Sequence, residues 1–279
     1  MTPTIALIAP GNMGAAIAKR LTEHKVTVLT ALTGRSQASA KRASDAGMRG
    51  VEDRQLAEAD FFMSIVPPGD AVALAKRLAP ILTAANKKPI YVECNAVSPQ
   101  TMNQIAKVIE GTGCAFVGAA IIGPPPKPGS TNTKIYAAGL AATQFAKLND
   151  YGLIVRVLEG PLTAASALKM SYAGITKGFT ALGAAMMLAA TRGGSSQALH
   201  AELTESQPAL LGYLTRQVPS MYSKAYRWVA ELEEISTFVG GDFPEYAMLE
   251  AAAKFYERIA ADVDGGNKET GAMDEFLKP

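Results

Sequence analysis

The segment Thr4–Gly14 constrains the fold of this chain more than any other stretch. An apolar, β-branched run at Ile5–Ile8 is followed at once by the small-residue turn Ala9–Gly11, and a helical pattern begins near Gly14. A strand, a tight turn and a helix in this order are the context in which such a glycine motif predicts a dinucleotide site. Plain packing of a helix on a strand is the alternative, because the first small residue is alanine rather than glycine.

Each small residue of this turn has a physical reason in the dinucleotide interpretation. Small side chains at Ala9 and Gly11 let the backbone turn tightly and approach a pyrophosphate, whereas Gly14 lets the helix pack closely on the strand. The free N–H groups at the start of the helix then face the phosphates. The predicted contacts to the dinucleotide in this segment are Ala9, Pro10, Gly11, Asn12, Met13 and Gly14.

Strand and helix signals alternate through the first half of the chain. This alternation predicts a mostly parallel, doubly wound α/β sheet, whose ligands bind outside the carboxyl ends of the strands. The strand candidates are Ile5–Ile8, Val26–Leu29, Phe61–Val66, Ile90–Glu93, Ala115–Ala120, Lys134–Ala138 and Ile154–Leu158, with helical patterns at 14–23, 37–46, 71–82, 99–110 and 141–149.

The pattern changes near residue 160, where the strand signals stop. Nearly all of the following chain is helical in pattern, beginning with one long helix over Leu162–Thr191. We therefore predict two domains, an α/β domain at residues 1–160 and an all-helical domain at residues 161–279. Shorter helices are expected at 197–205, 209–216, 221–238 and 245–261, followed by a frayed polar tail from Gly265.

The residues after the second predicted strand distinguish between nicotinamide dinucleotides. An enzyme that binds the ribose 2′-hydroxyl of NAD usually carries a carboxylate there, but this chain has Thr33, Gly34, Arg35 and Ser36. A guanidinium and a hydroxyl group suit a 2′-phosphate, so this segment predicts NADP. The alternative is that Arg35 is a solvated loop cation and that Ser36 caps the next helix.

Three more loops lie at predicted carboxyl ends of strands. Val66, Pro67 and Pro68 form a stiff exit where the ribose of the cofactor would pass, although two prolines also suit the entry to a helix. Asn95 follows the next strand, and we expect it to bind the nicotinamide ribose or a substrate. A rigid wall of the substrate site is predicted at Ile122, Gly123 and Pro124.

Lys169 is the residue best suited to chemistry. Helical spacing places it on one face of the long helix together with Ser166, Tyr172 and Thr176. Its two neighbours in sequence are apolar, and loss of water around a lysine lowers the pKa of its amine, which makes it a usable acid or base near neutral pH. A lysine that extends to solvent is the structural alternative.

Composition excludes several classes of function. The net charge of +2 argues against a general nucleic-acid or membrane-surface role, and the uncharged, apolar stretch at 178–190 is too short to span a bilayer. Two cysteines, Cys94 and Cys114, do not form a disulfide framework, so we expect buried thiols and a reducing cytoplasm. His24 and His200 are isolated in sequence, and no metal site is predicted.

Taken in order, these features resemble a known superfamily over essentially the whole chain. The small-residue turn, the Gly-Arg-Ser and Val-Pro-Pro segments, the glycine-rich strand at 118–123 and Lys169 on a long helix are similar to the 6-phosphogluconate dehydrogenase and β-hydroxyacid dehydrogenase superfamily. The segments 206–211 and 224–235 resemble a poorly characterised branch with its own helical C-terminal domain. The resemblance implies a Rossmann domain, a homodimer and NAD(P)-linked oxidoreduction, in which Lys169 assists proton transfer at the substrate hydroxyl.

The chain departs from the superfamily near the expected substrate. β-Hydroxyacid dehydrogenases typically place Ser-Gly-Gly where this chain has Ile122–Pro124, and asparagine where it has Ala173. The substrate is therefore not expected to be a standard small 3-hydroxy acid bound in the standard way. We expect Tyr172 to replace a missing hydrogen-bond donor.

Arg227 and Trp228 complete the predicted site. An arginine and a tryptophan on a helix of the second domain are expected to close over the cleft and present a cation to an anionic substrate, although Trp228 also suits core packing. The leading hypothesis is an NADP-dependent oxidoreductase acting on a small hydroxy acid or a related carbonyl compound. Imine reduction on the same scaffold and NADP binding without catalysis, as in a redox sensor, are the alternatives.

Overall fold

The computed structural model describes residues 2–278 and divides into two compact units. The first unit extends to Lys169, and the second begins at Met170. The division falls inside the long helix α7 (Ala164–Arg192), so the first turns of this helix, including Lys169, belong with the α/β unit.

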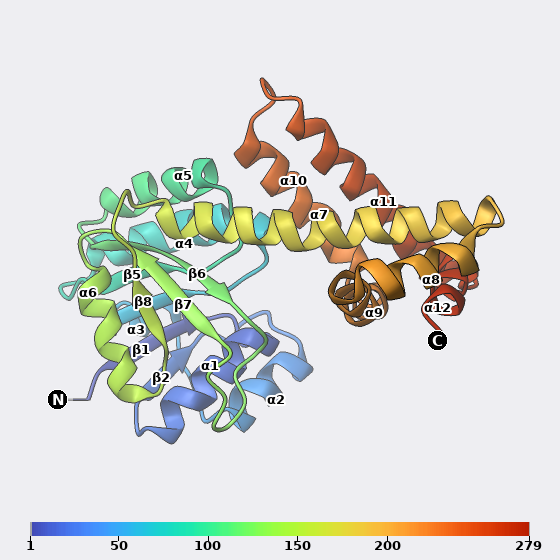
Figure 1. Cartoon of the computed structure of the whole chain (residues 1–279). Helices are drawn as coiled ribbons and strands as arrows, with labels where there is room; N and C mark the ends of the chain where they lie inside the picture. Colours follow the sequence, from blue (N-terminus) through green and yellow to red (C-terminus); the bar gives the residue numbers. More distant parts are fainter. Residues whose placement is uncertain (1, 279) are drawn as a thin grey trace. The chain divides into compact units, whose positions relative to one another are not determined.

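One eight-stranded sheet forms the centre of the α/β unit, in the order β3-β2-β1-β4-β5-β6-β7-β8 (Figure 1). Neighbouring strands are parallel except β6 and β7, which pair antiparallel. The mostly parallel, doubly wound sheet expected from sequence is thus confirmed. The strands are β1 (Thr4–Ile8), β2 (Thr27–Thr30), β3 (Arg49–Gly50), β4 (Phe61–Ser64), β5 (Ile90–Glu93), β6 (Phe116–Ile122), β7 (Lys134–Ala138) and β8 (Val155–Val157).

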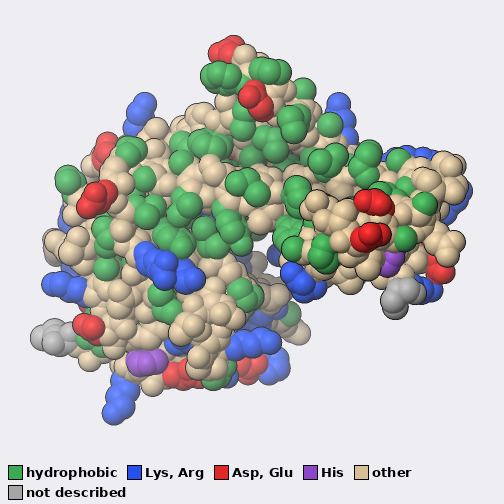
Figure 2. Space-filling model, in the orientation of Figure 1, with side chains coloured by type: hydrophobic (Ala, Val, Ile, Leu, Met, Phe, Trp, Pro, Cys, Tyr) green, Lys and Arg blue, Asp and Glu red, His purple; other side chains and the backbone are tan. Residues whose placement is uncertain are grey.

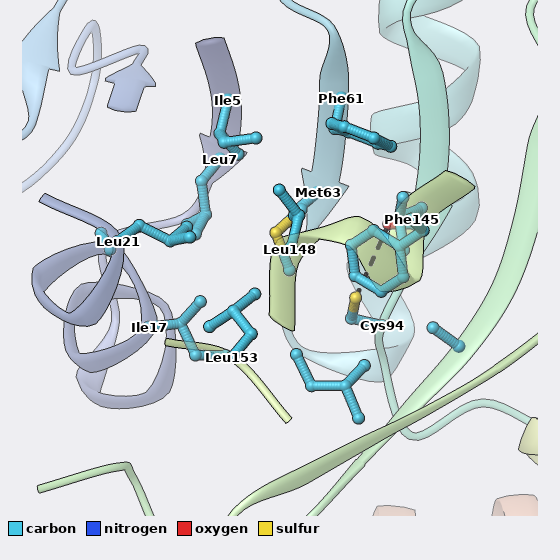
Figure 3. Packing of buried hydrophobic residues seen from close by; sticks show 14 of the residues in the cluster. Ile5, Leu7, Ile17, Leu21, Phe61, Met63, Cys94, Phe145, Leu148 and Leu153 are labelled. Carbon is cyan, nitrogen blue, oxygen red and sulfur yellow. Dashed lines mark hydrogen bonds between the residues drawn. The ribbon is translucent and has the colours of Figure 1, made fainter. Parts of the chain in front are cut away.

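Helices cover both faces of this sheet, and each face has its own hydrophobic core. Side chains alternate along a strand, so β1 contributes Leu7 to one core and Ile8 to the other. Figure 3 shows the first core, in which Leu7 lies next to Leu21 and Phe145 belongs to the same cluster. The helical elements are α1 (Asn12–Glu23), α2 (Gln37–Asp45), α3 (Asp53–Leu56), η1 (Pro68–Asp70), α4 (Ala71–Ala84), α5 (Pro99–Glu110), α6 (Ala142–Phe145) and η2 (Ala146–Tyr151).

The antiparallel pair β6–β7 follows from the chain between its strands. Only eleven residues separate Ile122 from Lys134, and four of them are prolines. A crossover to a parallel strand needs a dozen or more residues and usually a helix, which these prolines disfavour. Sequence analysis did not predict β3 and α3, because elements of two and four residues are too short to show a periodic pattern.

The second unit is helical. Within it, glycines let helices approach closely: a Cβ on Gly183 would lie 2.4 Å from Leu214, and one on Gly174 would lie 3.2 Å from Ile235. Lys177 of α7 is buried and pairs with Glu231 at 2.6 Å, which ties α7 to α10. After α7 the helices are α8 (Ser196–Ser206), α9 (Pro208–Tyr222), α10 (Ala225–Val239), α11 (Glu245–Gly265) and α12 (Lys268–Phe276).

The prediction of a frayed tail from Gly265 is wrong. Helix α12 lies there, and three of its side chains, Thr270, Met273 and Phe276, are buried. Asp262 of α11 accepts hydrogen bonds from the backbone N–H groups of Glu269 and Thr270 at 2.9 and 2.8 Å. These bonds satisfy amide groups of the first turn of α12. The acidic partner lies in another helix, which a local sequence pattern does not reveal.

Helix α7 is long and apolar enough to span a bilayer by length and composition alone. The core helix of a soluble protein passes the same test, and 44% of the most apolar window is buried within the protein. The buried pair of Lys177 and Glu231 also lies on this helix. We therefore describe α7 as a core helix.

Candidate functional site

The turn between β1 and α1 is shaped by backbone contacts. The N–H of Gly11 donates to the carbonyl oxygen of Ala9 at 2.8 Å, and that of Ala15 donates to Gly11 at 2.8 Å. A Cβ at Gly14 would lie only 2.1 Å from the Ala9 oxygen, so glycine is required there by the packing of α1 on β1. The glycine at position 14 is therefore explained by packing within the protein, without a ligand.

In contrast to Gly14, Gly11 is not required by any packing contact within the described residues. Its φ of −72° is open to any residue, and among residues 2–278 no atom would lie within 4 Å of a Cβ built on it. Gly11 is the N-cap of α1, and within the described chain no side chain caps this helix. The open space at Gly11 therefore lies at the start of α1, where a helix has free N–H groups that suit a pyrophosphate, and binding of a dinucleotide there stays a prediction.

Arg42 supports this cradle from α2. Its Nε donates to the carbonyl oxygen of Pro10 at 3.0 Å, and its Nη2 donates to the hydroxyl of Ser39 at 2.9 Å. Sequence analysis missed Arg42. The available signal was the spacing of Ser36, Ser39 and Arg42, which places the three residues along one face of the helix that begins after β2.

The loop after β2 presents Arg35 to solvent. Gly34 has a φ of +73°, in the left-handed region that favours glycine, and the side chain of Arg35 after it is exposed. Ser36 is the N-cap of α2, since its Oγ accepts from the N–H of Ser39 at 3.2 Å. Ser36 therefore caps a helix, which was the structural alternative to binding a 2′-phosphate. Arg35 is the exposed cation of this segment.

A pocket of about 530 Å³ lies beside this loop. Thr33, Gly34 and Arg35 line one part of it, and Val66 after β4 lines another. Sequence analysis missed its charged residues from α3, η1 and α4. Glu52, Asp53, Asp70 and Arg77 also line it, and Arg77 forms an ion pair with Asp53.

Pro67 and Pro68 lead from β4 into α4. Pro68 begins the short helix η1, so the structural alternative considered for the two prolines is present. Pro67 precedes it as the N-cap. Together with Val66 they form the stiff connection expected from sequence, and a contact between these prolines and a cofactor stays a prediction.

Asn95 at the end of β5 is turned into the protein. Its side chain is 4% exposed, its Oδ1 accepts from the N–H of Val66 at 2.6 Å, and its Nδ2 donates to the hydroxyl of Ser64 at 2.9 Å. These bonds hold the ends of β4 and β5 together. A direct contact of Asn95 with a cofactor or substrate stays a prediction, whereas its internal role is a feature that sequence analysis missed.

The start of α7 is brought against the sheet by small residues. A Cβ at Gly118 of β6 would lie 2.3 Å from the carbonyl oxygen of Leu162, so the chain passes directly over that glycine. Ala120, Ala138 and Ala165 form a small cluster next to it. The hydroxyl of the buried Ser166 donates to the carbonyl oxygen of Val97.

This packing places Lys169 at the carboxyl end of β6. The Nζ of Lys169 donates to the carbonyl oxygen of Ile121 at 3.0 Å, and its side chain is half-buried. Lys169 therefore lies beside the segment Ile122–Pro124, which sequence analysis assigned to the substrate site. The structure brings these two parts of the predicted site together.

The loop that follows β6 is held in place. Gly123 has a φ of +124°, and the hydroxyl of Thr133 donates to the carbonyl oxygen of Pro124 at 2.5 Å. Arg20 of α1 donates to the carbonyl oxygens of Ser130 at 3.1 Å and Gly152 at 3.2 Å. These contacts fix parts of the loop after β6, and the role of Ile122–Pro124 as a wall of the substrate site stays a prediction.

The remaining predicted residues belong to the helical unit. Tyr172 is 50% exposed and lies one turn after Lys169 on α7, while Arg227 on α10 is exposed. Trp228 packs edge-to-face on Tyr256 with ring centroids 5.1 Å apart, as its structural alternative expects. The Nζ of Lys177 lies 5.5 Å from the centre of the Trp228 ring. Roles of these residues toward a substrate stay predictions.

Both cysteines are buried free thiols, as expected. Burial, with the charge of Glu93 second, raises the pKa of Cys94 well above its ordinary value. Within residues 2–278 there is no cluster of three or more His, Cys, Asp or Glu side chains that would hold a metal ion.

Two family models match this chain. The NAD binding domain of 6-phosphogluconate dehydrogenase matches residues 4–150, and a domain of unknown function, DUF1932, matches residues 190–259. An uncharacterized 28.5 kDa protein from the 7S RNA 5′ region of Methanothermus fervidus is 31% identical over 162 residues. That match covers 57% of this chain and 60% of the length of its relative.

Solved structures share the fold over nearly the whole length. The conserved protein MTH1747, described as structurally similar to 3-hydroxyacid dehydrogenases, is 28% identical with a TM-score of 0.72, and the match covers 94% of this chain and 98% of that one. Mycobacterium tuberculosis 3-hydroxyisobutyrate dehydrogenase with L-serine is 18% identical with a TM-score of 0.75 and 99% coverage of both chains. An imine reductase from Myxococcus stipitatus with NADP⁺ is 18% identical with a TM-score of 0.55, covering 99% of this chain and all of that one.

Proposed function

We propose, from the premise that this chain belongs to the 6-phosphogluconate dehydrogenase family of NAD(P)-dependent oxidoreductases, that it is an NADP-dependent oxidoreductase of a small hydroxy acid or a related carbonyl compound. One observation carries the proposal. The N-terminus of α1 has no side-chain cap within the described residues, and a Cβ on Gly11 would meet none of their atoms within 4 Å; the pocket at Arg35 follows β2, the strand that pairs with β1. Helix N-termini of this kind bind phosphate.

The preference for NADP rests on the loop after β2. Arg35 stands exposed in the pocket wall, where its guanidinium is available for a charge-assisted bond to a 2′-phosphate. Arg42 holds the carbonyl oxygen of Pro10 and thereby fixes the shape of the pyrophosphate turn. No carboxylate occupies residues 33–36, where an NAD-binding enzyme usually carries one.

Lys169 is proposed as the general acid and base. When bound, NADP supplies hydride transfer at its nicotinamide ring. We propose that the Lys169 ammonium group, which donates to the carbonyl oxygen of Ile121, gives a proton to the oxygen of a carbonyl substrate during reduction. In the reverse direction the amine takes the proton of the substrate hydroxyl. We propose that Tyr172, one turn further along α7, adds a hydroxyl donor, and that Arg227 binds an anionic substrate.

Imine reduction is the second candidate. Ala173 follows Tyr172, and its buried side chain offers no hydrogen bond to a substrate carboxylate. The residues Ile122–Pro124 also lack a hydroxyl or amide side chain. A site with fewer groups for a carboxylate is better suited to an uncharged C=N substrate, and the imine reductase of Myxococcus stipitatus shares the fold.

The cofactor assignment is tested with Arg35→Ala. Loss of the 2′-phosphate contact should raise the Kd for NADPH by about tenfold or more, while the Kd for NADH changes little. Fluorescence titration of both cofactors measures this, and Arg54→Ala, on α3 outside the pocket at Arg35, is the matched control. Equal losses for the two cofactors would refute the role of Arg35.

The reaction is tested by a screen. Hydroxy acids, aldehydes, ketones and imines are each supplied with NADP(H) and NAD(H), and the absorbance of the reduced nicotinamide is followed. Turnover of a hydroxy acid or aldehyde supports the leading proposal, and turnover of imines alone supports the second. NADPH binding without turnover of any compound would instead favour a sensor.

A homodimer in the cytoplasm is the proposed form. Exposed apolar side chains, Ile175 at 72%, Leu182 at 60% and Met248 at 71%, adjoin an apolar groove of about 550 Å³ between α7 and α11. Figure 2 shows hydrophobic side chains gathered over α10 and α11. A second copy would cover this surface. Light scattering of the wild type and of Leu182→Glu tests the assembly, and a monomeric wild type would refute it.

A further inference from the structure

The carboxyl end of β5 carries a completely buried acid. Glu93 is 0% exposed, its Oε1 accepts from the N–H of Asn95 at 2.9 Å, and its Oε2 has no hydrogen-bond partner among residues 2–278. Burial raises the pKa of Glu93 to about 7, although hydrogen bonds from Asn95 and Ser64 oppose the change. Glu93 is thus neutral in slightly acidic solution and charged in slightly alkaline solution.

Two hydrogen bonds connect Glu93 to the wall of the nucleotide pocket. The first joins the Asn95 N–H to Glu93 Oε1, and the second joins the Val66 N–H to Asn95 Oδ1 at 2.6 Å. Val66 itself lines the 530 Å³ pocket. Ser64 closes the network by accepting from Asn95 Nδ2 at 2.9 Å. A change at Glu93 therefore reaches the pocket through one intervening residue.

Glu93 is the group of this network that changes charge near neutral pH. Tyr91 on β5 and Cys94 directly after it stay neutral, because burial raises the pKa of each well above its ordinary value. The nearby Arg77 of α4 opposes this rise for Tyr91. From β4 and the loop after β5, Ser64 and Asn95 do not titrate.

We propose that Glu93 is a positioning residue. Its proton keeps the hydrogen bond between Asn95 and Val66, and with it the pocket wall at Val66, in the form that binds the dinucleotide, so that cofactor affinity falls as Glu93 ionises. The inference rests on the proposed NADP site. Ionisation places an unpaired charge in the core, which draws water and polar groups toward Oε2 and away from their present partners. The charge also repels the phosphates of the cofactor through a medium of low dielectric constant.

The test compares the wild type with Glu93→Gln. The Kd for NADPH is measured by fluorescence from pH 6 to pH 8.5, and in the wild type it should rise by about three- to tenfold, as expected if binding raises the pKa of Glu93 by up to about one unit. Glutamine keeps an oxygen for the Asn95 N–H but does not ionise, so its profile should show only the titration of the 2′-phosphate. Glu110→Gln, an exposed acid at the end of α5, should keep the wild-type profile.

Overlapping profiles for wild type and Glu93→Gln, with both proteins binding, would overturn the inference and leave the proposed function intact. Failure of NADPH and NADH to bind at any pH would instead overturn the proposed function.

A second measurement needs no variant. Calorimetry of NADH binding to the wild type at pH 7.5, in two buffers of different ionisation enthalpy, should detect uptake of a fraction of a proton. NADH has no 2′-phosphate that titrates in this range. Binding without proton uptake would refute the role of Glu93 even if Glu93→Gln does not fold.

Discussion

At the carboxyl edge of the sheet, the residues after β1 and β2 form an open side, whereas the polar side chains at the ends of β4 and β5 are buried and form a closed side. On the open side, Gly11 faces empty space and Arg35 is exposed to solvent. On the closed side, Ser64, Glu93 and Asn95 are buried, and Asn95 bonds to both of the others. A polar or glycine residue at the end of a strand is thus left open in one place and is buried in the fold in another, and only the first arrangement leaves it available to a ligand.

Lys169→Met, at the carboxyl end of β6, is expected to make the largest change. Methionine keeps most of the packing of the lysine stem but cannot transfer a proton, so turnover should fall by about 10²- to 10⁴-fold. The Kd for NADPH should stay near the wild-type value. Steady-state kinetics on a substrate found by the screen measures the loss, with Lys107→Met on α5 as the control. Turnover close to that of the wild type would remove Lys169 from the chemistry.

The two glycines of the β1–α1 turn separate ligand binding from packing. Gly14→Ala places a Cβ 2.1 Å from the Ala9 oxygen and should lower the free energy of unfolding by about 3 kcal/mol or more. Gly11→Ala meets no protein atom among residues 2–278 and should cost less than about 1 kcal/mol, yet weaken NADPH binding by about tenfold. Urea denaturation and cofactor titration of both variants check this. Unchanged NADPH binding by Gly11→Ala would contradict an open cradle.

On the closed side, Glu93 should make stability depend on pH. The unfolded chain loses this proton near pH 4.5, whereas the folded protein keeps it up to about pH 7, so stability should fall between these values and level off above pH 7. The loss is at most about 3 kcal/mol. Glu93→Gln should therefore gain stability relative to the wild type as pH rises from 5 to 8. The free energy of unfolding of both proteins is measured by urea denaturation at each pH. If it changes with pH in the same way for both, Glu93 does not titrate as described.

The sequence predicted the elements that repeat a clear local pattern. Alternating apolar strands and amphipathic helices specified the doubly wound sheet, and the turn at Ala9–Gly14 specified its first loop. It did not predict α12, because the Asp262 side chain that caps this helix comes from another helix. It also did not show the internal bonds of Asn95, predicted to bind the nicotinamide ribose or a substrate, because nothing in the local sequence places Ser64 and Val66 beside its side chain.

Local chemistry along the chain determined the fold class and the strand–turn–helix at its start, and it is the basis for the proposal of Lys169, since each depends on residues a few positions apart. Tertiary structure alone decided which groups are available to a ligand. Gly118 lets the chain at Leu162 pass over β6 and so brings Lys169 to Ile121, and the pairing of β4 with β5 buries Glu93. Both outcomes depend on contacts between residues distant in sequence. Those contacts decide which side chains are buried, and burial raises the free energy of a charge and makes an unpaired polar group costly.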